Sequence, residues 1–377
     1  MKLLHLSDLH IGKRVHGFSM LEDQIYILDQ ILDIIRTERA EGVILAGDIY
    51  DKPIPSAEAV QVFDTFLNRL ADEQIMVFAV SGNHDSPERL AFGSHLMDSR
   101  GVYLSPVYDG QIKQISFTDA YGELVIHLLP YIKPAVARQV WKEDKIESYE
   151  DAVRAAIWHM EIDPAKRNIL VAHQFVAGAS NCESEELLVG GLDQIPASIF
   201  DGFDYVALGH LHSPQYVERE TIRYCGTPLK YSFSEENQKK SVILIECREK
   251  GEIAIRKILL QPLRDMRSVR GKYLEVTDLS GSAGLSREDY IKVILTDEED
   301  IPDGLQKLQA IYPHLMQLEY DNVRTRENRK IESAEAAEEK SELELFMDFY
   351  ELQNNQPMSE VQKQYVTHMI QDIWEEV

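Results

Sequence analysis

The fold is decided by the stretch Ile75-Met76-Val77-Phe78-Ala79-Val80-Ser81-Gly82-Asn83-His84-Asp85. Its first six residues are apolar, and such a short run predicts a buried strand. Gly82 to Asp85 then form a polar cluster at the carboxyl end of that strand. Open α/β sheets bind their ligands at this edge. We therefore expect the side chains of this cluster to lie at a ligand site.

The same arrangement occurs four more times within the first 212 residues. Asp8-Leu9-His10 follows Leu3 to Leu6, Gly47-Asp48 follows Val43 to Ala46, His173 follows Ile169 to Ala172, and Gly209-His210-Leu211-His212 follows Tyr205 to Leu208. The five clusters can thus converge on one edge, although about 200 residues separate the first from the last. Together they predict a site that holds a pair of metal ions.

The residue types of these clusters suit divalent metals. Carboxylate, amide and imidazole groups without cysteine favour manganese, iron or zinc over a structural zinc site. Asp8 and His10 would face the same side of an extended segment, so both could reach one ion. Asp48 has two oxygens and could bridge two ions. The remaining candidate ligands are Asn83, His173, His210 and His212. Seven ligands with one shared carboxylate give two four-ligand sites, the arrangement in which ions roughly 3.5–4 Å apart clamp a phosphoryl group.

Composition sets limits on the class of protein. A chain of 377 residues with 44% hydrophobic residues is expected to form two or three globular domains. Its three cysteines, Cys182, Cys225 and Cys247, are far apart and indicate a reducing cytoplasm without a disulfide framework. No apolar run is long enough to span a bilayer, and His5 and Asp8 stand where a signal peptide would be apolar, so we expect a cytoplasmic protein with no membrane partner.

The net charge is −25, which argues against a protein that coats nucleic acid with a basic face. Residues 331–377 contain twelve acidic residues and two lysines, a net of −10. If DNA is the substrate, metals, local basic residues or a partner must offset the repulsion of its phosphates.

Residues 1–265 alternate strand-like runs with amphipathic stretches and predict an α/β sandwich of mixed strand direction. Helical spacing of apolar residues occurs between Met20 and Ile35 and between Ala59 and Leu70, and residues 134–163 form a further helical stretch whose second half Ser148 could cap. Two β-rich runs on either side of Lys250-Gly251 predict a hairpin.

A second domain is expected over residues 271–325, as a small α/β cap. Tyr273 to Val276, Tyr290 to Leu295 and Met316 to Tyr320 are expected to be strands, and Ile301 to Ile311 a helix. Residues 326–340 are expected to be a charged linker.

Two short amphipathic helices are expected within residues 341–377. They have more apolar surface than such short helices can bury alone, so either they pack on their own cap or they bind a partner. The residues that would do so are Leu343, Phe346, Phe349, Tyr350, Val361, Tyr365, Met369, Ile373 and Trp374.

The five clusters in this order resemble the calcineurin-like metallophosphoesterases, whose pattern is Asp-x-His, Gly-Asp, Gly-Asn-His-Asp/Glu, a lone histidine and Gly-His-x-His. More narrowly, the chain is similar to the SbcD family, the nuclease subunits of bacterial SbcCD complexes. Further matching stretches are Leu6 to Gly12, Gly47 to Asp51, Ser81 to Ser86, Cys225-Gly226-Thr227-Pro228 and Tyr231-Ser232-Phe233-Ser234-Glu235. This resemblance implies a β-sandwich flanked by helices, with a cap domain and C-terminal helices.

The resemblance also implies residue roles. One metal would be bound by Asp8, His10, Asp48 and His212, and the other by Asp48, Asn83, His173 and His210. His84 would be catalytic rather than a ligand: it would position the phosphate and assist departure of the sugar oxygen, which suits an imidazole.

Several polar residues near the clusters have two interpretations each. Asp51 and Asp85 could orient imidazoles of the site or could simply form turns. The DNA-contact candidates Lys13, Arg14, His16 and Arg89 could touch phosphates or lie in solvated loops. We interpret His5, His95, His127, His159 and Cys182 as structural, because each lacks a second ligand at a convincing spacing.

The implied function is that of a manganese-dependent DNA nuclease subunit with two metal ions. It would hydrolyse phosphodiesters as a 3′–5′ double-strand exonuclease and a single-strand and hairpin endonuclease in DNA recombination, replication and repair. Its partners would be DNA ends and hairpins, an SbcC-type ATPase docked on the C-terminal helices, and a second copy of the chain, which makes a heterotetramer. Helices near Ala57 to Leu70 and Pro87 to Asp98 would form the homodimer by this resemblance.

Two other functions remain open. The chain could be a different metallophosphoesterase that hydrolyses nucleotides or phosphoproteins, although such an enzyme does not need the cap and the helical tail. It could also be a catalytically silent scaffold, although a scaffold does not need all seven ligands.

Overall fold

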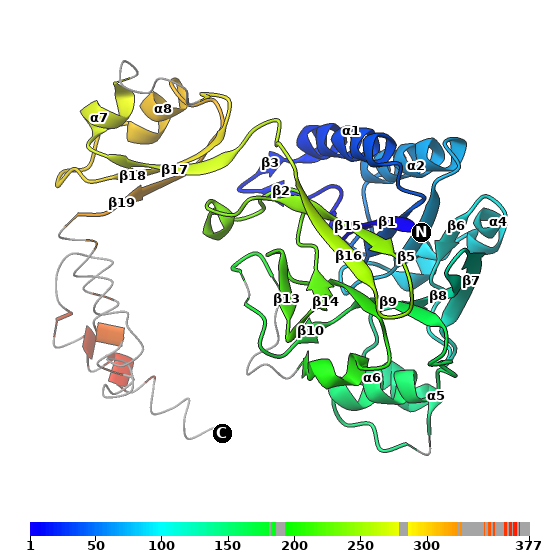
Figure 1. Cartoon of the computed structure of the whole chain (residues 1–377). Helices are drawn as coiled ribbons and strands as arrows, with labels where there is room; N and C mark the ends of the chain where they lie inside the picture. The colour runs from blue at the N-terminus through cyan, green and yellow to red at the C-terminus, as the bar shows by residue number, and fades with distance from the viewer. Residues whose placement is uncertain are drawn as a thin grey trace. The chain divides into compact units, whose positions relative to one another are not determined.

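The computed structural model describes residues 1–142, 144–180, 182–185, 193–278 and 286–322, and further along the chain residues 325, 343, 346–347, 350, 358–359, 362–363, 365–367 and 369. The chain forms two compact units. The first comprises Met1–Arg267 and Glu288–Tyr290, and the second comprises Ser268–Arg287 and Ile291–Val377. Each unit is described separately below (Figure 1).

The first unit is built on two six-stranded sheets. The first sheet has the order β16 (Ile253–Leu259), β15 (Ser241–Cys247), β1 (Lys2–Leu6), β4 (Gly42–Ala46), β5 (Met76–Val80) and β6 (Val102–Leu104). The second has the order β13 (Gln215–Val217), β14 (Arg219–Tyr224), β12 (Tyr205–Gly209), β9 (Arg167–His173), β8 (Gly122–Leu129) and β7 (Lys113–Asp119). All five strands predicted before the polar clusters are present.

Both sheets contain parallel strands, with antiparallel strands at one edge of the first sheet and at both edges of the second. Strands β1, β4, β5 and β6 are parallel, and β15 and β16 add an antiparallel hairpin at one edge, as predicted around Lys250-Gly251. In the second sheet β8, β9, β12 and β14 are parallel. Because parallel strands end at the same edge, the residues that follow β1, β4, β5, β9 and β12 are brought together there.

The two sheets pack face to face around one apolar core. Leu3, Ile44 and Phe78 come from the first sheet, and Ile169 and Tyr205 from the second. The strands β4, β9 and β12 are buried along their whole length. This explains why they appear in the sequence as continuous apolar runs rather than as alternating patterns.

Helices cover the outer faces of this sandwich. Figure 1 shows α1 (Leu21–Glu38) and α2 (Ala57–Asp72) on one side and α5 (Pro134–Val140) and α6 (Tyr149–Trp158) on the other. The helical stretch predicted over 134–163 is thus two helices. The second begins with the capping box of Ser148 and Asp151, which confirms the predicted cap. The fold is the predicted β-sandwich flanked by helices.

Shorter elements complete the first unit. They are β2 (Arg14–Val15), β3 (Phe18–Ser19), α3 (Pro87–Leu90), α4 (Ser94–Asp98), β10 (Phe175–Val176), β11 (Gln194–Ile195), η2 (Ala197–Phe200) and η3 (Phe233–Glu235). None of the helices in the described part of the chain combines the length and the apolar character that a membrane crossing requires.

The second unit contains a three-stranded sheet in the order β17 (Met266–Gly271), β18 (Tyr290–Leu295) and β19 (Leu315–Tyr320), with α7 (Tyr273–Thr277) and α8 (Gly304–Gln309). Its core includes Val276, Ile291, Val293 and Leu308. The α/β character of this segment was predicted, and α8 is shorter than the helix expected from Ile301 to Ile311.

One element of the second unit was predicted wrongly. Tyr273 to Val276 was expected to be a strand, but it lies in the helix α7. The Glu275 carboxylate accepts the backbone N–H of Lys272, and Asp297 accepts that of Tyr273, so local hydrogen bonds satisfy the start of a helix. The strand expected here lies just before it, at Met266–Gly271.

The C-terminal segment is described only at isolated positions and in stretches of two or three residues. Leu343, Phe346, Tyr350, Tyr365 and Met369 are helical. Phe346, Tyr365 and Met369 are exposed. Phe349, Val361, Ile373 and Trp374 lie outside the described residues, as do all residues of the linker expected over 326–340.

Candidate metal centre

The seven candidate ligands meet where the parallel strands of both sheets end. Asp8 and His10 follow β1, Asp48 follows β4, Asn83 follows β5, His173 is the last residue of β9, and His210 and His212 follow β12. The two sheets thus contribute to the site from opposite sides. The site exists because the loops after five strands all lie at one edge of the sandwich.

Asp48 lies in the middle of the cluster. Its Oδ2 atom is 3.4 Å from His173 Nε2, 3.7 Å from His10 Nε2 and 4.0 Å from His84 Nε2. Its other oxygen, Oδ1, accepts the backbone N–H of His84 at 2.9 Å. This central place is the one that a bridging carboxylate needs.

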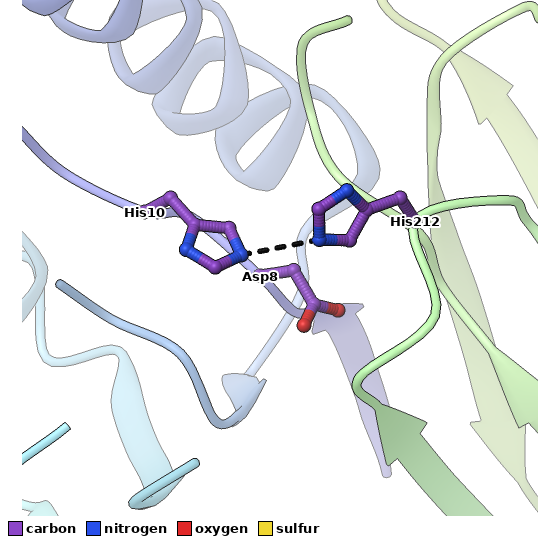
Figure 2. A group of neighbouring side chains, drawn as sticks. All are labelled: Asp8, His10 and His212. Atoms are coloured by element: carbon purple, nitrogen blue, oxygen red, sulfur yellow. Dashed lines mark hydrogen bonds between the residues drawn. The ribbon is translucent and has the colours of Figure 1, made fainter. Parts of the chain in front are cut away.

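The other ligands form two groups around Asp48. Asn83 Oδ1 lies 2.9 Å from His173 Nε2 and 3.1 Å from His210 Nδ1. On the other side, Asp8, His10 and His212 lie together, with 3.2 Å between the Nε2 atoms of the two histidines (Figure 2). Asn83 thus contacts His173 and His210, while Asp8 lies close both to His10 and His212 and to His173.

Four of the candidate ligands have an unusual backbone. Asp8, His10, Asp48 and His210 have φ angles of 52°, 45°, 49° and 102°, in a region that residues other than glycine rarely adopt. The expectation that Asp8 and His10 lie in an extended segment is therefore wrong. Strained residues of this kind persist where the surrounding structure holds them, and they concentrate at functional sites.

The ligand loops also approach one another very closely. A Cβ atom on Gly209 would lie 1.9 Å from the carbonyl oxygen of Ala46, and one on Gly82 would lie 2.1 Å from Asp48 Oδ1. Only glycine allows these contacts. Gly209 therefore allows the two sheets to approach each other at the site, and Gly82 allows the loops after β4 and β5 to do so.

Burial keeps three of the histidines neutral. It lowers the pKa of His10 well below the ordinary value and that of His210 to about 3. Burial also lowers the pKa of His212, against an opposite effect of the nearby Glu235. Neutral imidazoles offer a lone pair, which is the form that binds a metal.

The remaining charges compensate one another around Asp48. Burial raises the pKa of Asp8 to about 7, and repulsion by Asp48 contributes. Burial alone would lower the pKa of His173, but Asp48 and Asp8 raise it to about 9. The His173 imidazolium thus supplies positive charge between two buried carboxylates, where a divalent cation would do so more strongly.

Some buried polar atoms of the cluster lack hydrogen-bond partners, as expected if they bind divalent metal ions. Asp8 Oδ2 and His210 Nε2 are buried without a hydrogen-bond partner in the described structure. Three overlapping groups of possible ligands each have their atoms within 4.8 Å of one another: Asp8, His10 and His212; His10, Asp48 and His84; and Asp8, Asp48 and His173. Buried polar atoms of this kind carry a large desolvation cost unless an ion or water pairs with them.

The other predicted site residues are placed as follows. His84 lies beside the cluster, and its Nδ1 atom is 3.1 Å from the carbonyl oxygen of Asp51. Asp51 Oδ1 is 3.7 Å from His10 Nδ1 and 2.8 Å from Lys13 Nζ. The Asp85 carboxylate accepts the backbone N–H of Gly82 in its own turn and those of Ile49 and Tyr50 in the loop after β4, and it bonds to no imidazole of the described residues.

The DNA-contact candidates lie in different surroundings. Lys13 pairs with Asp51 beside the cluster, whereas Arg14 donates to the carbonyl oxygen of Gly17. His16 and Arg89 are exposed. These positions leave all four as candidates only.

Four residues near the site were not assigned a role from the sequence. Ser184, Glu185, Glu235 and Lys240 surround His212 on the side away from the other ligands. Of these, only Glu235 lies in a stretch that carries the family resemblance. Buried charged residues give no signal of their own in a single sequence, because charge usually indicates a solvated position.

Two family models and a full-length relative match this chain. A family model described as calcineurin-like phosphoesterase matches residues 1–214, and one described as type 5 capsule protein repressor C-terminal domain matches residues 262–354. The chain is 30% identical over 374 residues to the SbcD subunit of the nuclease SbcCD from Staphylococcus epidermidis, and the match covers 98% of each chain.

Similarity to solved structures is low. A dimetal phosphatase from Danio rerio has a TM-score of 0.42 and 12% identity, covering 69% of this chain and 96% of that one. The protein TT1561 of Thermus thermophilus has a TM-score of 0.37 and 11% identity, covering 68% and 98%.

The chain belongs to the calcineurin-like phosphoesterase family, and it is therefore a metal-dependent hydrolase of phosphoester bonds. Within that family it is a homologue of the SbcD nuclease over almost its whole length.

Proposed function

We propose that this protein is the manganese-dependent DNA nuclease subunit of an SbcCD-type complex. The observation that carries the proposal is the cluster of seven ligands with Asp48 at its centre, at the ends of five strands. The full-length similarity to a nuclease subunit, with a matching C-terminal family region, supports the substrate class.

The residues fit two ions. Asp8, His10, Asp48 and His212 would hold one, and Asp48, Asn83, His173 and His210 the other. Manganese suits this mixture of oxygen and nitrogen ligands. When bound, the two ions supply an activated water and neutralise negative charge on the phosphate. They matter especially in a chain with a net charge of −25, which would otherwise repel DNA.

His84 is proposed as the residue that handles a proton. Its Nδ1–H donates to the carbonyl oxygen of Asp51, and this directs Nε2 towards Asp48. Its side chain is 15% exposed, so Nε2 can meet a substrate and still be held in place. In its protonated form Nε2 would donate to the sugar oxygen that leaves phosphorus.

The wider biology is proposed from the relatives. The protein would act with an SbcC-type ATPase in the cytoplasm, as a homodimer within a heterotetramer, on double-stranded DNA ends and hairpins during recombination, replication and repair. The exposed Phe346, Tyr365 and Met369 of the C-terminal segment are available to such a partner. The activities would be 3′–5′ exonuclease on duplexes and endonuclease on single strands and hairpins.

The test compares a labelled hairpin DNA with a chromogenic phosphodiester, each with Mn²⁺ and with or without the ATPase. We expect cleavage of the hairpin, stimulated by the ATPase. Cleavage of the small substrate alone would make the protein a different phosphoesterase. No cleavage of either substrate, with two metals bound, would make it a scaffold.

A further inference from the structure

His212 is held by a chain of two short hydrogen bonds on the side away from the ligand cluster. Its Nδ1 atom lies 2.6 Å from Ser184 Oγ, and Ser184 Oγ lies 2.6 Å from Glu235 Oε1. The three groups come from loops that are far apart in the sequence. We call these three groups the His212 relay.

Glu235 is fixed at the far end of the relay. Its side chain is completely buried, and its Oε2 atom pairs with Lys240 Nζ at 2.5 Å. The same ammonium group donates to Thr227 Oγ1 and to the carbonyl oxygen of His212. The relay therefore ends on a carboxylate that cannot turn without breaking a buried ion pair.

The serine loop is tied to His212 a second time. The Glu185 carboxylate accepts the backbone N–H of His212 with one oxygen and the backbone N–H of Cys182 with the other. The loop of residues 182–185 is thus attached to His212 through both its side chain and its backbone. Ser184 is held at the imidazole by these contacts.

The chemistry of the groups fixes the direction of each hydrogen bond. An ionised carboxylate can only accept, so the Ser184 hydroxyl must donate to Glu235. Glu235 is in its ionised form, because its Oε2 atom pairs with the buried ammonium group of Lys240. The serine oxygen then accepts, which requires the proton of His212 on Nδ1. His212 Nε2 is left with a lone pair that faces His10.

The ligands around His212 are held differently. His173 Nδ1 donates to a backbone carbonyl, that of Ala46, at 2.8 Å. His10 Nδ1 is buried and has no hydrogen-bond partner in the described part of the chain. Of these three imidazoles, only His212 has its tautomer set by side chains that a mutation can change.

We propose that Glu235 and Ser184 are positioning residues that select the Nδ1–H tautomer of His212 and thereby present its Nε2 atom to a metal ion. The inference rests on the proposed metal site and deepens it. Residues that orient a metal-bound histidine in this manner typically contribute 10–100-fold to metal affinity. The effect should be confined to the ion that His212 binds, because Ser184 and Glu235 contact none of the other ligands' side chains in the described structure.

Glu235→Gln is the variant that tests the tautomer of His212 most directly. Lys240 would take the amide oxygen, so the amide NH₂ would face Ser184 and donate to it. The serine hydroxyl would then donate to His212 Nδ1, and the proton of the imidazole would move to Nε2. The variant should therefore reverse the tautomer, whereas Ser184→Ala should only release it.

The tautomer can be read directly in the metal-free, full-length protein. Long-range proton–nitrogen NMR spectra of ¹⁵N-histidine-labelled protein distinguish the two forms, and the His212→Gln variant assigns the signal. We expect Nδ1–H in the wild type and Nε2–H in Glu235→Gln. An Nε2–H signal in the wild type would overturn the proposal without any other variant.

Metal affinity provides the second readout. A calorimetric titration with Mn²⁺ should show two binding sites in the wild type. The affinity of one of them should be about 10–100-fold lower in Ser184→Ala and Glu235→Gln. Ser184→Thr, which retains the hydroxyl, should restore the affinity. The exposed residues Ser180 and Glu220 provide the matched controls Ser180→Ala and Glu220→Gln.

Wild-type Mn²⁺ affinity at both sites in Ser184→Ala and in Glu235→Gln would overturn the inference. Neither readout uses DNA, so failure of the proposed function is separable: a wild type that binds two ions with the expected tautomer but cleaves no DNA would refute the nuclease activity alone.

Discussion

His10 Nε2 and His212 Nε2 lie 3.2 Å apart, although 202 positions separate these histidines in the chain. Burial lowers the pKa of both, so both rings are neutral near pH 7. Two neutral imidazoles can face each other at this distance only as a donor and an acceptor. The relay makes His212 the acceptor, and His10 Nε2 must then hold its proton in the metal-free protein. An ion would replace this internal hydrogen bond.

Asp48 is expected to control both metal sites, because its Oδ2 atom lies within 4.0 Å of histidines from both groups. Asp48→Asn should weaken Mn²⁺ binding at both sites by more than the roughly 100-fold that a merely orienting residue contributes. Metal analysis after gel filtration would measure the loss. The exposed Asp33→Asn is the matched control, and loss of only one ion in Asp48→Asn would show that Asp48 does not bridge.

His84→Gln should separate chemistry from metal binding. The variant removes the proton that Nε2 would transfer, and such groups contribute about 10²–10⁴ to a rate. We expect cleavage of hairpin DNA to fall by that factor, while Mn²⁺ content and binding of the ATPase stay near wild type. Cleavage at the wild-type rate would remove His84 from the reaction.

Asp85 is expected to stabilise the fold rather than to take part in the chemistry. Its carboxylate accepts the backbone N–H groups of Ile49, Tyr50 and Gly82. Asp85→Ala would leave three donors unpaired, two of them buried and one partly buried, at about 1–3 kcal/mol each. A loss of at least about 3 kcal/mol should lower Tm by roughly 6–12 °C. Asp33→Ala, at an exposed site, should change stability by no more than about 0.5 kcal/mol.

Gly209 joins the two sheets at the site. Its alanine variant would place a Cβ atom 1.9 Å from the Ala46 carbonyl oxygen and 2.8 Å from His173 Nδ1. The backbones must move apart, so Gly209→Ala should lower Tm and lose Mn²⁺ together, at a cost of at least about 1–3 kcal/mol. Gly202→Ala meets only Ile162 Cδ1 at 3.8 Å and should change neither property. Normal metal binding by Gly209→Ala would show that the sheets can separate without disturbing the ligands.

The strands that carry the site, and the edge at which the site lies, could be predicted from the sequence. Strands buried on both faces are continuous apolar runs, and the polar residues that follow them must lie at one edge. The strands before Asp48 and His173 were found in this way. Their buried hydrogen-bonding partners were not, because a contact such as that between Ser184 and Glu235 spans 51 positions and has no periodic pattern.

Local conformation was the other part that the sequence did not reveal. Asp8 and His10 follow a strand and were expected to continue it, but tertiary contacts hold both in the left-handed region. Asp8 N–H donates to Gly47 O, and His10 N–H donates to Asp48 O, so the loop after β1 is fixed by the loop after β4. The helix α7 was missed for a similar reason, since capping by Glu275 outweighed the β propensity of Tyr273 and Val276.

Stability at acidic pH provides a test that does not alter a candidate metal ligand. His5 is buried between the Tyr205 hydroxyl and the Leu208 carbonyl, and burial lowers its pKa from 6.5 to about 3. Below about pH 6.5 the His5 side chain binds a proton in the unfolded chain but not in the folded chain. Protonation of His5 therefore does not affect the free energy of unfolding above pH 6.5, and it lowers that free energy increasingly as the pH falls. The free energy of unfolding falls by about 1.4 kcal/mol per pH unit between pH 6.5 and pH 3.

His5→Gln removes the titrating group, so its Tm should fall less between pH 7.5 and pH 5.5 than that of the wild type, by roughly 2–4 °C. Differential scanning calorimetry of the metal-free protein measures the Tm at both pH values, and His95→Gln, at an exposed position, is the control. An equal pH dependence of Tm in His5→Gln and wild type would show that His5 becomes protonated in the folded chain.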